Sequence, residues 1–205
     1  MKLYYFPVAP NPTRVLVYLG EKGIEDIERV PVDLRQGEQN AEAHLARNPE
    51  GSLPVLELDN GDYLTESLPT IEYIEELYPE PPLIGSDADS RAYARSLERK
   101  AEMQLLGPVA RLVHATNSPL GLPVNEAVAE IERARLPTSF ERFNKTIADR
   151  PFVAGDTPTI ADCTLFAALQ FGQFFGVDIP AECGNLQRWY TAFQQRPSTA
   201  FEFPE

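Results

Sequence analysis

Residues 48–67 read NPEGSLPVLELDNGDYLTES and combine a turn, two short strands and the start of a helix. The turn formers at its beginning precede an apolar run at 53–58, which predicts a strand. Asn60-Gly61 is a hairpin signal because both central residues of such a turn need a positive φ, so the next run should pair antiparallel with that strand. Apolar residues then recur at helical spacing, which puts Ser67 at a helix N-terminus.

Pro54 and Ser67 give this stretch the features of a ligand site. If the Leu53-Pro54 bond is cis, the backbone N–H and C=O of Leu53 point out of the sheet and can pair with an extended ligand. At the helix start, free N–H groups and the positive end of the dipole favour an anion, and the Ser67 hydroxyl adds a donor. The alternative for each feature alone is plain turn or capping chemistry. Together they predict a surface that holds a small peptide with a free carboxylate.

The composition restricts the environment and the partners. The 205 residues include 31 acidic and 18 basic side chains, and the resulting net charge of −13 opposes binding to nucleic acid or to an anionic membrane. Cys163 and Cys183 fit neither a disulfide framework nor a CxxC motif, and 2 histidines offer few partners for a metal site. No run approaches membrane-spanning length. We therefore expect a soluble, cytoplasmic protein with no metal, no nucleic-acid partner and no membrane attachment.

The pattern of strands and helices predicts two domains. The first half has the order expected of a thioredoxin-like α/β sheet: strand 2–6, helix 13–21, strand 29–33, a weak helix at 42–47, then two strands and a helix. Prolines stop this last helix and stiffen the segment after it. Long helical patterns then dominate, at 89–116, 125–149, 159–176 and 186–196. The expected boundaries are a thioredoxin-like domain at 1–78, a linker at 79–88 and an all-helical domain at 89–205.

Two local signals mark the helical half. Gly107-Pro108 should kink the first helix, because proline removes a backbone hydrogen bond and crowds the preceding turn. Thr159 and Asp162 have the spacing of a capping box, in which both side chains satisfy N–H groups at a helix start. We expect the capping box to serve folding and not chemistry.

These motifs resemble the cytosolic glutathione transferases over nearly the whole chain. The module that ends in SLPVLELDNGDYLTES is similar to their glutathione-binding domain, and PFVAGDTPTIADCTLFAAL at 151–169 is similar to the capping-box helix that is a hallmark of the family. The resemblance is to bacterial members, with the nu class one candidate and the subclass open. It implies a homodimeric enzyme with glutathione as co-substrate, which activates the thiol for attack on a small hydrophobic electrophile, a peroxide or a disulfide.

The resemblance also implies which residues bind glutathione. Pro54 matches the family's cis-proline, with the Leu53 backbone paired to the cysteinyl unit. Glu66 and Ser67 match the pair that holds the γ-glutamyl amino and carboxylate groups.

The glycine end of glutathione is matched less specifically. Gln39 corresponds to a loop residue that reaches this end in related bacterial enzymes, and His44 is nearby. For both residues, an ordinary polar side chain on an exposed loop is an equally good explanation. Ser52 occupies a position where many relatives carry Gln or Lys.

The catalytic group is the open question. A thiol with a pKa of about 8.5 is mostly protonated at neutral pH, so a donor beside the sulfur must stabilise the thiolate. Ala9 stands where many relatives carry a catalytic serine or cysteine. Asn11 resembles the asparagine near the sulfur in nu-class enzymes, with an ordinary N-cap before Pro12 as the alternative. Tyr5 resembles the tyrosine of the mammalian tyrosine-type classes, with packing as its alternative.

We rank Asn11 first and Tyr5 second as the catalytic residue. Asn11 favours peroxide or disulfide reduction, whereas Tyr5 favours conjugation. Because Ala9 removes a usual catalytic side chain, a non-catalytic binding or regulatory protein of the same fold is the alternative function. For Arg14 the alternatives are a contribution of positive potential near the helix start and a solvated helix face, and we expect the latter. The second-substrate pocket should lie between the loop after the first strand and the helix around 103–114, where His114 is a weak candidate.

Overall fold

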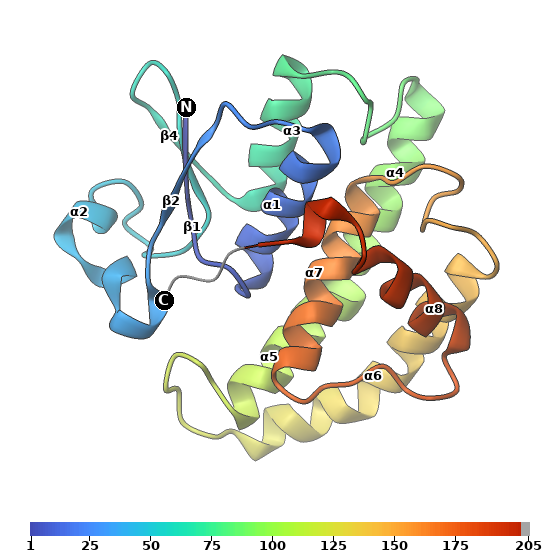
Figure 1. Ribbon diagram of the computed structural model, residues 1–205. Helices are drawn as coiled ribbons and strands as arrows, with labels where there is room; N and C mark the ends of the chain where they lie inside the picture. Colours follow the sequence, from blue (N-terminus) through green and yellow to red (C-terminus); the bar gives the residue numbers. More distant parts are fainter. Residues whose placement is uncertain (202–205) are drawn as a thin grey trace.

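The computed structural model describes residues 1–201, and a small mixed sheet lies beside a mostly helical part (Figure 1). The first part contains strands β1 (Lys2–Tyr5), β2 (Glu28–Pro31), β3 (Val55–Glu57) and β4 (Tyr63–Thr65), helices α1 (Pro10–Lys22), α2 (Glu42–Leu45) and α3 (Ser67–Leu77), and the short 3-10 turns η1 (Leu34–Gln36) and η2 (Glu38–Asn40). The second part contains α4 (Ala88–Ala101), the π-helical turn η3 (Glu102–Leu106), α5 (Gly107–Thr116), α6 (Glu126–Ile147), α7 (Ile160–Phe174), α8 (Gly184–Phe193) and the 3-10 turn η4 (Pro197–Thr199). The predicted fold class is confirmed.

The sheet has the strand order β2-β1-β3-β4. Strand β1 pairs parallel with β2 and antiparallel with β3. Strand β3 pairs antiparallel with β4, as predicted for the hairpin. One detail of the hairpin differs from the prediction: of the two central residues, Gly61 has a positive φ, 88°, but Asn60 does not. The Gly61 N–H bonds to the Leu58 carbonyl, and the Leu58 N–H bonds to the Asp62 carbonyl. These bonds enclose a longer loop than the expected two-residue turn, with the left-handed conformation at glycine alone.

Side chains alternate between the two faces of the sheet. Leu3 and Leu56 join the main core, which α1 and α3 cover and which continues into the helical part (Figure 1). Tyr4 and Val55 point the other way, into a smaller cluster with Leu53. Because α1 also packs against α7, the two parts share one continuous core.

The predicted break at Gly107-Pro108 takes the form of a π-helical turn. Helix α4 runs into the turn η3, and the Gly107 N–H bonds to the Glu102 carbonyl five positions back. Such turns insert a residue into an α-helix and are frequent at functional sites. Glu98 and Glu102 are four positions apart, so they lie on the same side of the helix, toward α1.

The capping box at the start of α7 is confirmed. The Asp162 carboxylate accepts hydrogen bonds from the Thr159 N–H at 2.9 Å, from the Val153 N–H at 2.8 Å and from the Trp189 indole at 3.1 Å. Burial raises the pKa of Asp162 to about 6, against the effect of these donors. The carboxylate therefore joins the helix start to the preceding loop and to α8.

A buried lysine attaches the segment after α3 to α1. The Lys22 ammonium donates to the carbonyl oxygens of Tyr78 at 2.5 Å and Pro81 at 2.7 Å. It also pairs with the Glu75 carboxylate, which accepts a further bond from the Ile84 N–H at 3.1 Å. The proline-rich segment is thus held in one position between the two parts of the chain.

Candidate functional site

The predicted strand entry and helix start lie next to each other at one edge of the sheet. Val55 pairs with Thr65, so Pro54 and Glu66 are neighbours across the β3–β4 ladder. The Leu53-Pro54 bond is cis, as the ligand hypothesis requires, and Leu53 precedes the first paired residue of β3. Ser67 is the first residue of α3 and is buried. The backbone of Leu53 and the N-terminus of an eleven-residue helix therefore border the same place.

Two residues with strained backbones border the site. Glu66 caps α3 with a φ of 69°, and its side chain is exposed. Val8, in the loop between β1 and α1, is buried with a φ of 74°, an outlier for a β-branched residue. Each such conformation costs on the order of 1–3 kcal/mol and is found preferentially where a site requires a particular backbone.

The loop before β3 is built from polar contacts around Ser52. The Asn48 amide donates to the Ser52 carbonyl at 3.0 Å and to its hydroxyl at 2.9 Å, and His44 Nε2 lies 3.2 Å from the same carbonyl. A Cβ at Gly51, which has a φ of 64°, would lie 3.2 Å from the Gln39 carbonyl, so η2 packs closely on this loop.

These contacts place Gln39 and Ser52 at the edge of the sheet where Leu53 lies. Two buried atoms here, Gln39 Oε1 and His44 Nδ1, have no hydrogen-bond partner among residues 1–201. Buried polar atoms without a partner are rare in native proteins, and a bound ligand is one way to satisfy them.

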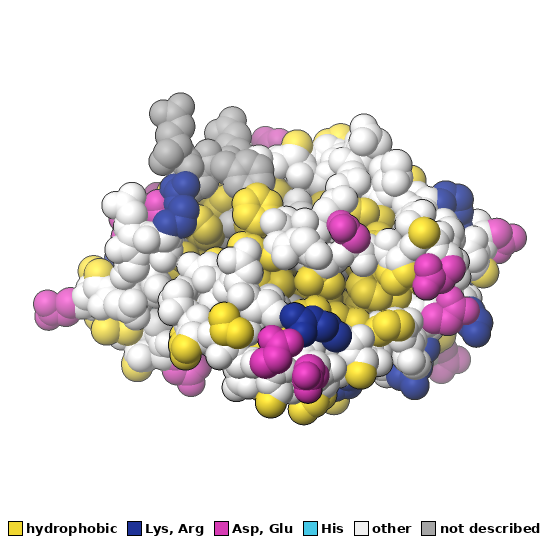
Figure 2. Space-filling view, turned by 90° about the horizontal axis from the view of Figure 1, so that it is seen from below, with side chains coloured by type: hydrophobic (Ala, Val, Ile, Leu, Met, Phe, Trp, Pro, Cys, Tyr) yellow, Lys and Arg dark blue, Asp and Glu magenta, His cyan; other side chains and the backbone are white. Residues whose placement is uncertain are grey.

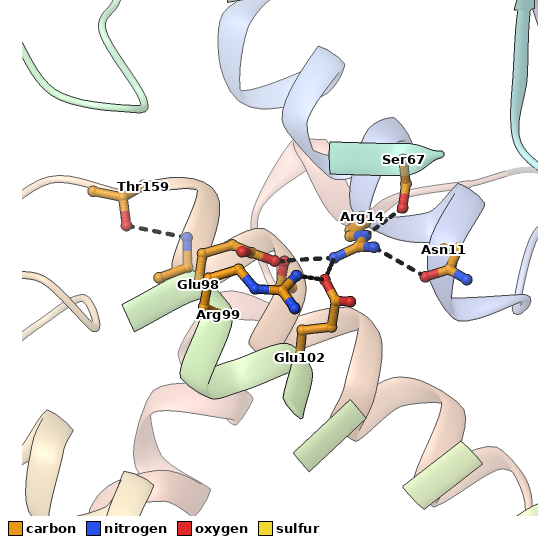
Figure 3. A network of polar contacts seen from close by, with 9 residues as sticks. Asn11, Arg14, Ser67, Glu98, Arg99, Glu102 and Thr159 are labelled. Atoms are coloured by element: carbon orange, nitrogen blue, oxygen red, sulfur yellow. Dashed lines mark hydrogen bonds and ion pairs between the residues drawn. The ribbon is translucent and has the colours of Figure 1, made fainter. Parts of the chain in front are cut away.

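Arg14 lies at the centre of the polar contacts between the two parts of the chain (Figure 3). The expectation of a solvated helix face is wrong, because the residue is 3% exposed. Its guanidinium donates to Ser67 Oγ at 2.7 Å and to Asn11 Oδ1 at 3.2 Å. It also pairs with Glu98 at 3.0 Å and Glu102 at 2.8 Å, both from the helical part.

The structure places Asn11 inside α1 and not at its N-cap. The helix begins at Pro10, two residues before the Pro12 start that the capping interpretation implied, and Ala9 is the N-cap without a side-chain hydrogen bond. Proline at either position suits a first helical turn, but the capping interpretation of Asn11 was wrong by two residues. Asn11 is partly exposed and contacts the Arg14 guanidinium.

Glu98 is the most buried carboxylate of this network. It is fully buried, and besides Arg14 it accepts a hydrogen bond from Thr164 at 3.2 Å. Its Oε2 atom has no partner among residues 1–201. Burial raises the pKa of Glu98 to about 7, although the Arg14 charge opposes this. Burial also acts on Glu102, but its bonds and charge interactions with Arg14 and Arg99 lower the pKa of that carboxyl.

An apolar pocket of about 110 Å³ lies next to the loop between β1 and α1. Figure 2 views this side of the molecule, where hydrophobic side chains line a hollow between the two parts. The pocket is lined by Phe6, Val8, Ala9, Pro10, Leu34, Arg35, His114, Pro119, Leu120, Phe171 and Phe175. This position agrees with the expected second-substrate pocket, except that Met103 is 59% exposed and does not line it.

His114 is the histidine of this pocket, and a ring nitrogen of its imidazole can donate or accept a hydrogen bond. Its Nδ1 lies 2.9 Å from the Ser118 hydroxyl, and its ring is 6.3 Å from that of Phe171. Burial lowers the pKa of His114, so the imidazole is neutral at pH 7. The Arg35 guanidinium pairs with Asp33 at 2.7 Å. The pocket therefore presents mainly apolar surface with little uncompensated positive charge.

Tyr5 is separate from the polar network. It ends β1, is partly buried, and packs its side chain against the main core. Sequence reasoning preferred a solvated face for Arg14, and it did not identify the pocket residues at 34, 119, 120, 171 and 175.

The His, Cys, Asp and Glu side chains of residues 1–201 form no group of three that could hold a metal ion. None of the helices in this part of the chain is both long and apolar enough to cross a membrane.

Comparisons with known proteins agree with this geometry. The family model described as "Glutathione S-transferase, N-terminal domain" matches residues 3–82, and "Glutathione S-transferase, C-terminal domain" matches residues 100–197. Glutathione S-transferase 2 of Saccharomyces cerevisiae is 34% identical over 97% of this chain and 87% of its own length. Maleylacetoacetate isomerase of Pseudomonas aeruginosa is 31% identical over 95% of this chain and 94% of its own.

Solved structures are similar over the same length. Gtt2 from Saccharomyces cerevisiae superimposes with a TM-score of 0.89 at 34% identity, over 97% of this chain and 98% of that one. A glutathione S-transferase domain-containing protein from Marinobacter aquaeolei gives 0.90 at 33% identity, over 98% of this chain and 100% of that one.

Proposed function

The chain belongs to the glutathione S-transferase family, and we propose that it binds glutathione at the Leu53-Pro54 turn and activates its thiol for attack on a small apolar electrophile. The observation that carries the proposal is the β3–β4 register. Because Val55 pairs with Thr65, the cis Leu53-Pro54 turn lies beside Glu66 and the start of α3, next to an apolar pocket.

The proposed glutathione site uses backbone groups at its centre and side chains at its ends. The N–H and C=O of Leu53 pair with the cysteinyl unit as a short added strand. The N-terminus of α3 and the Ser67 hydroxyl hold the γ-glutamyl carboxylate, and Glu66 holds the amino group. Gln39 and Ser52 are assigned to the glycine end, where the unsatisfied Oε1 of Gln39 can accept a hydrogen bond from the glycyl N–H.

Asn11 is the proposed donor to the sulfur, together with the positive end of α1. A hydrogen bond to a charged group contributes about 1.5–3 kcal/mol. Since each pKa unit corresponds to about 1.4 kcal/mol, one such bond lowers the thiol pKa from about 8.5 to about 7. Half of the bound thiol is then ionised at neutral pH, instead of a few per cent. Tyr5 is the second candidate, and its contacts with the core favour it less.

The pocket next to Ala9 is proposed to bind the electrophile. Its neutral His114 and its paired Arg35 favour an apolar substrate over a dicarboxylate such as maleylacetoacetate, the compound named in one relative. An organic peroxide or a mixed disulfide fits the same thiolate chemistry. We do not favour an isomerase of acidic substrates, because the described residues that line the pocket include no second cation.

The protein is further proposed to act as a cytoplasmic homodimer. Tyr63 on β4, Leu77 on α3 and Tyr93 on α4 are exposed apolar side chains, and Arg95 on α4 pairs with Glu72 on α3 at 2.8 Å. A second copy would cover such a surface. The free thiols of Cys163 and Cys183 suit a reducing compartment.

Three assays and one titration test the proposal. Glutathione binding is measured by calorimetry, and turnover is measured with a chloronitrobenzene, an organic hydroperoxide and a mixed disulfide. We expect binding and turnover with at least one substrate. Binding without turnover on any of them supports the non-catalytic alternative, and absence of binding overturns the proposal. Sedimentation velocity reports the oligomeric state.

A further inference from the structure

We propose that Arg14 is a positioning residue that couples the carboxylate end of the glutathione site to its thiol end. It would do so by holding the Ser67 hydroxyl and the Asn11 amide on one edge of its guanidinium group. The inference rests on the proposed function, because it concerns how the assigned groups are held. Arg14 itself is buried and need not touch the ligand.

The contacts of Arg14 divide between the two parts of the chain. Nε donates to Ser67 Oγ at 2.7 Å and Nη2 donates to Asn11 Oδ1 at 3.2 Å. These two nitrogens form the side-on edge with which arginine usually binds a carboxylate. Nη1 donates to Glu98 at 3.0 Å and to Glu102 at 2.8 Å (Figure 3). One edge of the guanidinium therefore faces the site, and the remaining amino group is attached to the helical part.

This arrangement determines the orientation of the Asn11 amide. A guanidinium has five N–H donors and no acceptor, so the amide atom that faces it must be the oxygen. The NH₂ group is consequently turned away from Arg14 (Figure 3). Within residues 1–201, the Asn11 Nδ2 group has no hydrogen-bond acceptor, although the residue is partly exposed. It remains free to donate to a ligand sulfur.

The same edge determines the orientation of the Ser67 hydroxyl. Because Ser67 Oγ accepts a bond from Arg14 Nε, its hydrogen cannot point toward the guanidinium. That hydrogen is available for a carboxylate at the start of α3. Both groups therefore present a donor to the ligand, and both orientations come from one side chain.

The carboxylates of the helical part hold the guanidinium in place on the side away from Ser67 and Asn11. Glu98 is fully buried and is also bonded by Thr164, and Glu102 is paired with Arg99 at 2.9 Å. A lysine at position 14 would keep the positive charge near both carboxylates. It is a point charge without a planar fork, so it could not hold Ser67 and Asn11 in these orientations together. Arg14→Lys therefore separates the effect of charge from the effect of geometry.

The main test is a double-mutant cycle on the pKa of the bound thiol. Ultraviolet thiolate absorbance across pH is measured for glutathione bound to the wild type, Asn11→Ala, Arg14→Lys and the double variant. Asn11→Ala should return the thiol pKa from about 7 to about 8.5, so the thiolate fraction at neutral pH should fall more than tenfold, from about half to a few per cent. Arg14→Lys should cause a similar reduction, and the double variant should be no worse than Asn11→Ala alone.

A matched control tests for general effects of replacing a paired arginine. Arg196 donates two bonds of 2.6 Å to Glu21, away from the pocket and from Ser67. Arg196→Lys should leave the thiol pKa and glutathione affinity as in the wild type. Denaturant midpoints of all variants show whether each is folded.

The outcomes separate this inference from the proposed function. If Arg14→Lys retains the wild-type thiol pKa while Asn11→Ala does not, charge is sufficient and the positioning role is overturned. Additive effects in the double variant also overturn it, because Arg14 would then act on the sulfur by itself. If the wild type binds no glutathione, or binds it with an unchanged thiol pKa, the proposed function fails first.

A second measurement uses the wild type and so does not depend on the folding of Arg14→Lys. In ¹⁵N-labelled protein, the Asn11 side-chain amide resonances, assigned by comparison with Asn11→Ala, are followed as glutathione-bound protein is titrated. They should shift with the ionisation of the bound thiol. Resonances that do not respond to thiol ionisation overturn the proposed orientation of the amide.

Discussion

Lys22 Nζ and Glu75 Oε2 lie 2.7 Å apart in an ion pair whose lysine side chain is completely buried. The ammonium also binds two carbonyl oxygens of the segment after α3. One group therefore neutralises the Glu75 carboxylate and satisfies these two backbone acceptors. Lys22→Met removes this group and leaves Glu75 buried without a cation. We expect a loss of about 3–5 kcal/mol in the free energy of unfolding, measured by urea denaturation. Lys22→Met combined with Glu75→Gln should recover part of the loss; no recovery would contradict this account.

Ser67→Ala tests the anion site at the start of α3. The hydroxyl is expected to donate to the glutathione carboxylate, and a hydrogen bond to a charged group contributes about 1.5–3 kcal/mol. Calorimetry should therefore show affinity reduced about ten- to hundredfold. Ser86→Ala is the matched control: this serine is exposed, lies in the segment before α4 and has no assigned role in the site, so it should change affinity much less. Equal losses in both variants would count against the assigned carboxylate site.

Ala9→Ser tests whether the loop between β1 and α1 lacks only a donor. Ala9 lines the pocket and is the N-cap of α1, so a serine there adds a hydroxyl at the helix start. We expect the pKa of bound glutathione thiol to fall by about one, seen as more thiolate absorbance at neutral pH. Ala9→Gly provides the same position without a donor and should not lower it. A similar pKa in both variants would mean that the sulfur lies elsewhere.

Phe175→Ala tests the electrophile pocket. The ring lines the pocket and packs edge-to-face on Phe171 with centroids 4.9 Å apart. Its loss should raise the KM for a chloronitrobenzene about tenfold without changing glutathione affinity. The adjacent Phe174 is 64% exposed and does not line the pocket, so Phe174→Ala should leave KM nearly unchanged. The opposite ranking of the two variants would exclude this pocket.

Glu98 should make stability depend on pH between about 4.5 and 7. Burial raises the pKa of Glu98 from 4.5 to about 7, so the folded state binds this proton more tightly than the unfolded state. The contribution is therefore most favourable below the unfolded pKa and is lost as pH rises through the folded pKa. Glu98→Gln, which imitates the protonated acid, should match the wild type near pH 4.5 and exceed it in stability above pH 7. The measurement is the urea midpoint of each protein across pH. If the difference in midpoint between Glu98→Gln and the wild type did not grow with pH, this account would be wrong.

Local patterns allowed much of the fold to be predicted. The strand entry, the hairpin and the start of α3 depend on neighbouring residues such as Pro54, Gly61 and Ser67, and each has its own backbone preference. The capping box of Thr159 and Asp162 was recognisable for the same reason. The start of α1 was less certain, since Pro10 and Pro12 both suit a first turn.

Contacts between distant segments could not be predicted in this way. The pocket brings residues near 34, 119 and 175 next to the loop after β1. No local sequence pattern predicts that these segments are in contact. Arg14 did carry a signal. The five residues that follow it, VLVYL at 15–19, are all hydrophobic, so a helix here has little polar surface on which an arginine could be solvated. A charge in such a helix requires partners from elsewhere, here Glu98 and Glu102.

The π-helical turn η3 sets the angular phase between α4 and α5. An α-helix advances about 100° per residue, so deleting one position in 102–106 would rotate α5 by about that angle relative to α4. With Glu98 still facing Arg14, His114 would then leave the pocket; with His114 kept in place, the carboxylate would turn away. The extra residue therefore allows one continuous helical rod to serve both the polar network and the apolar pocket.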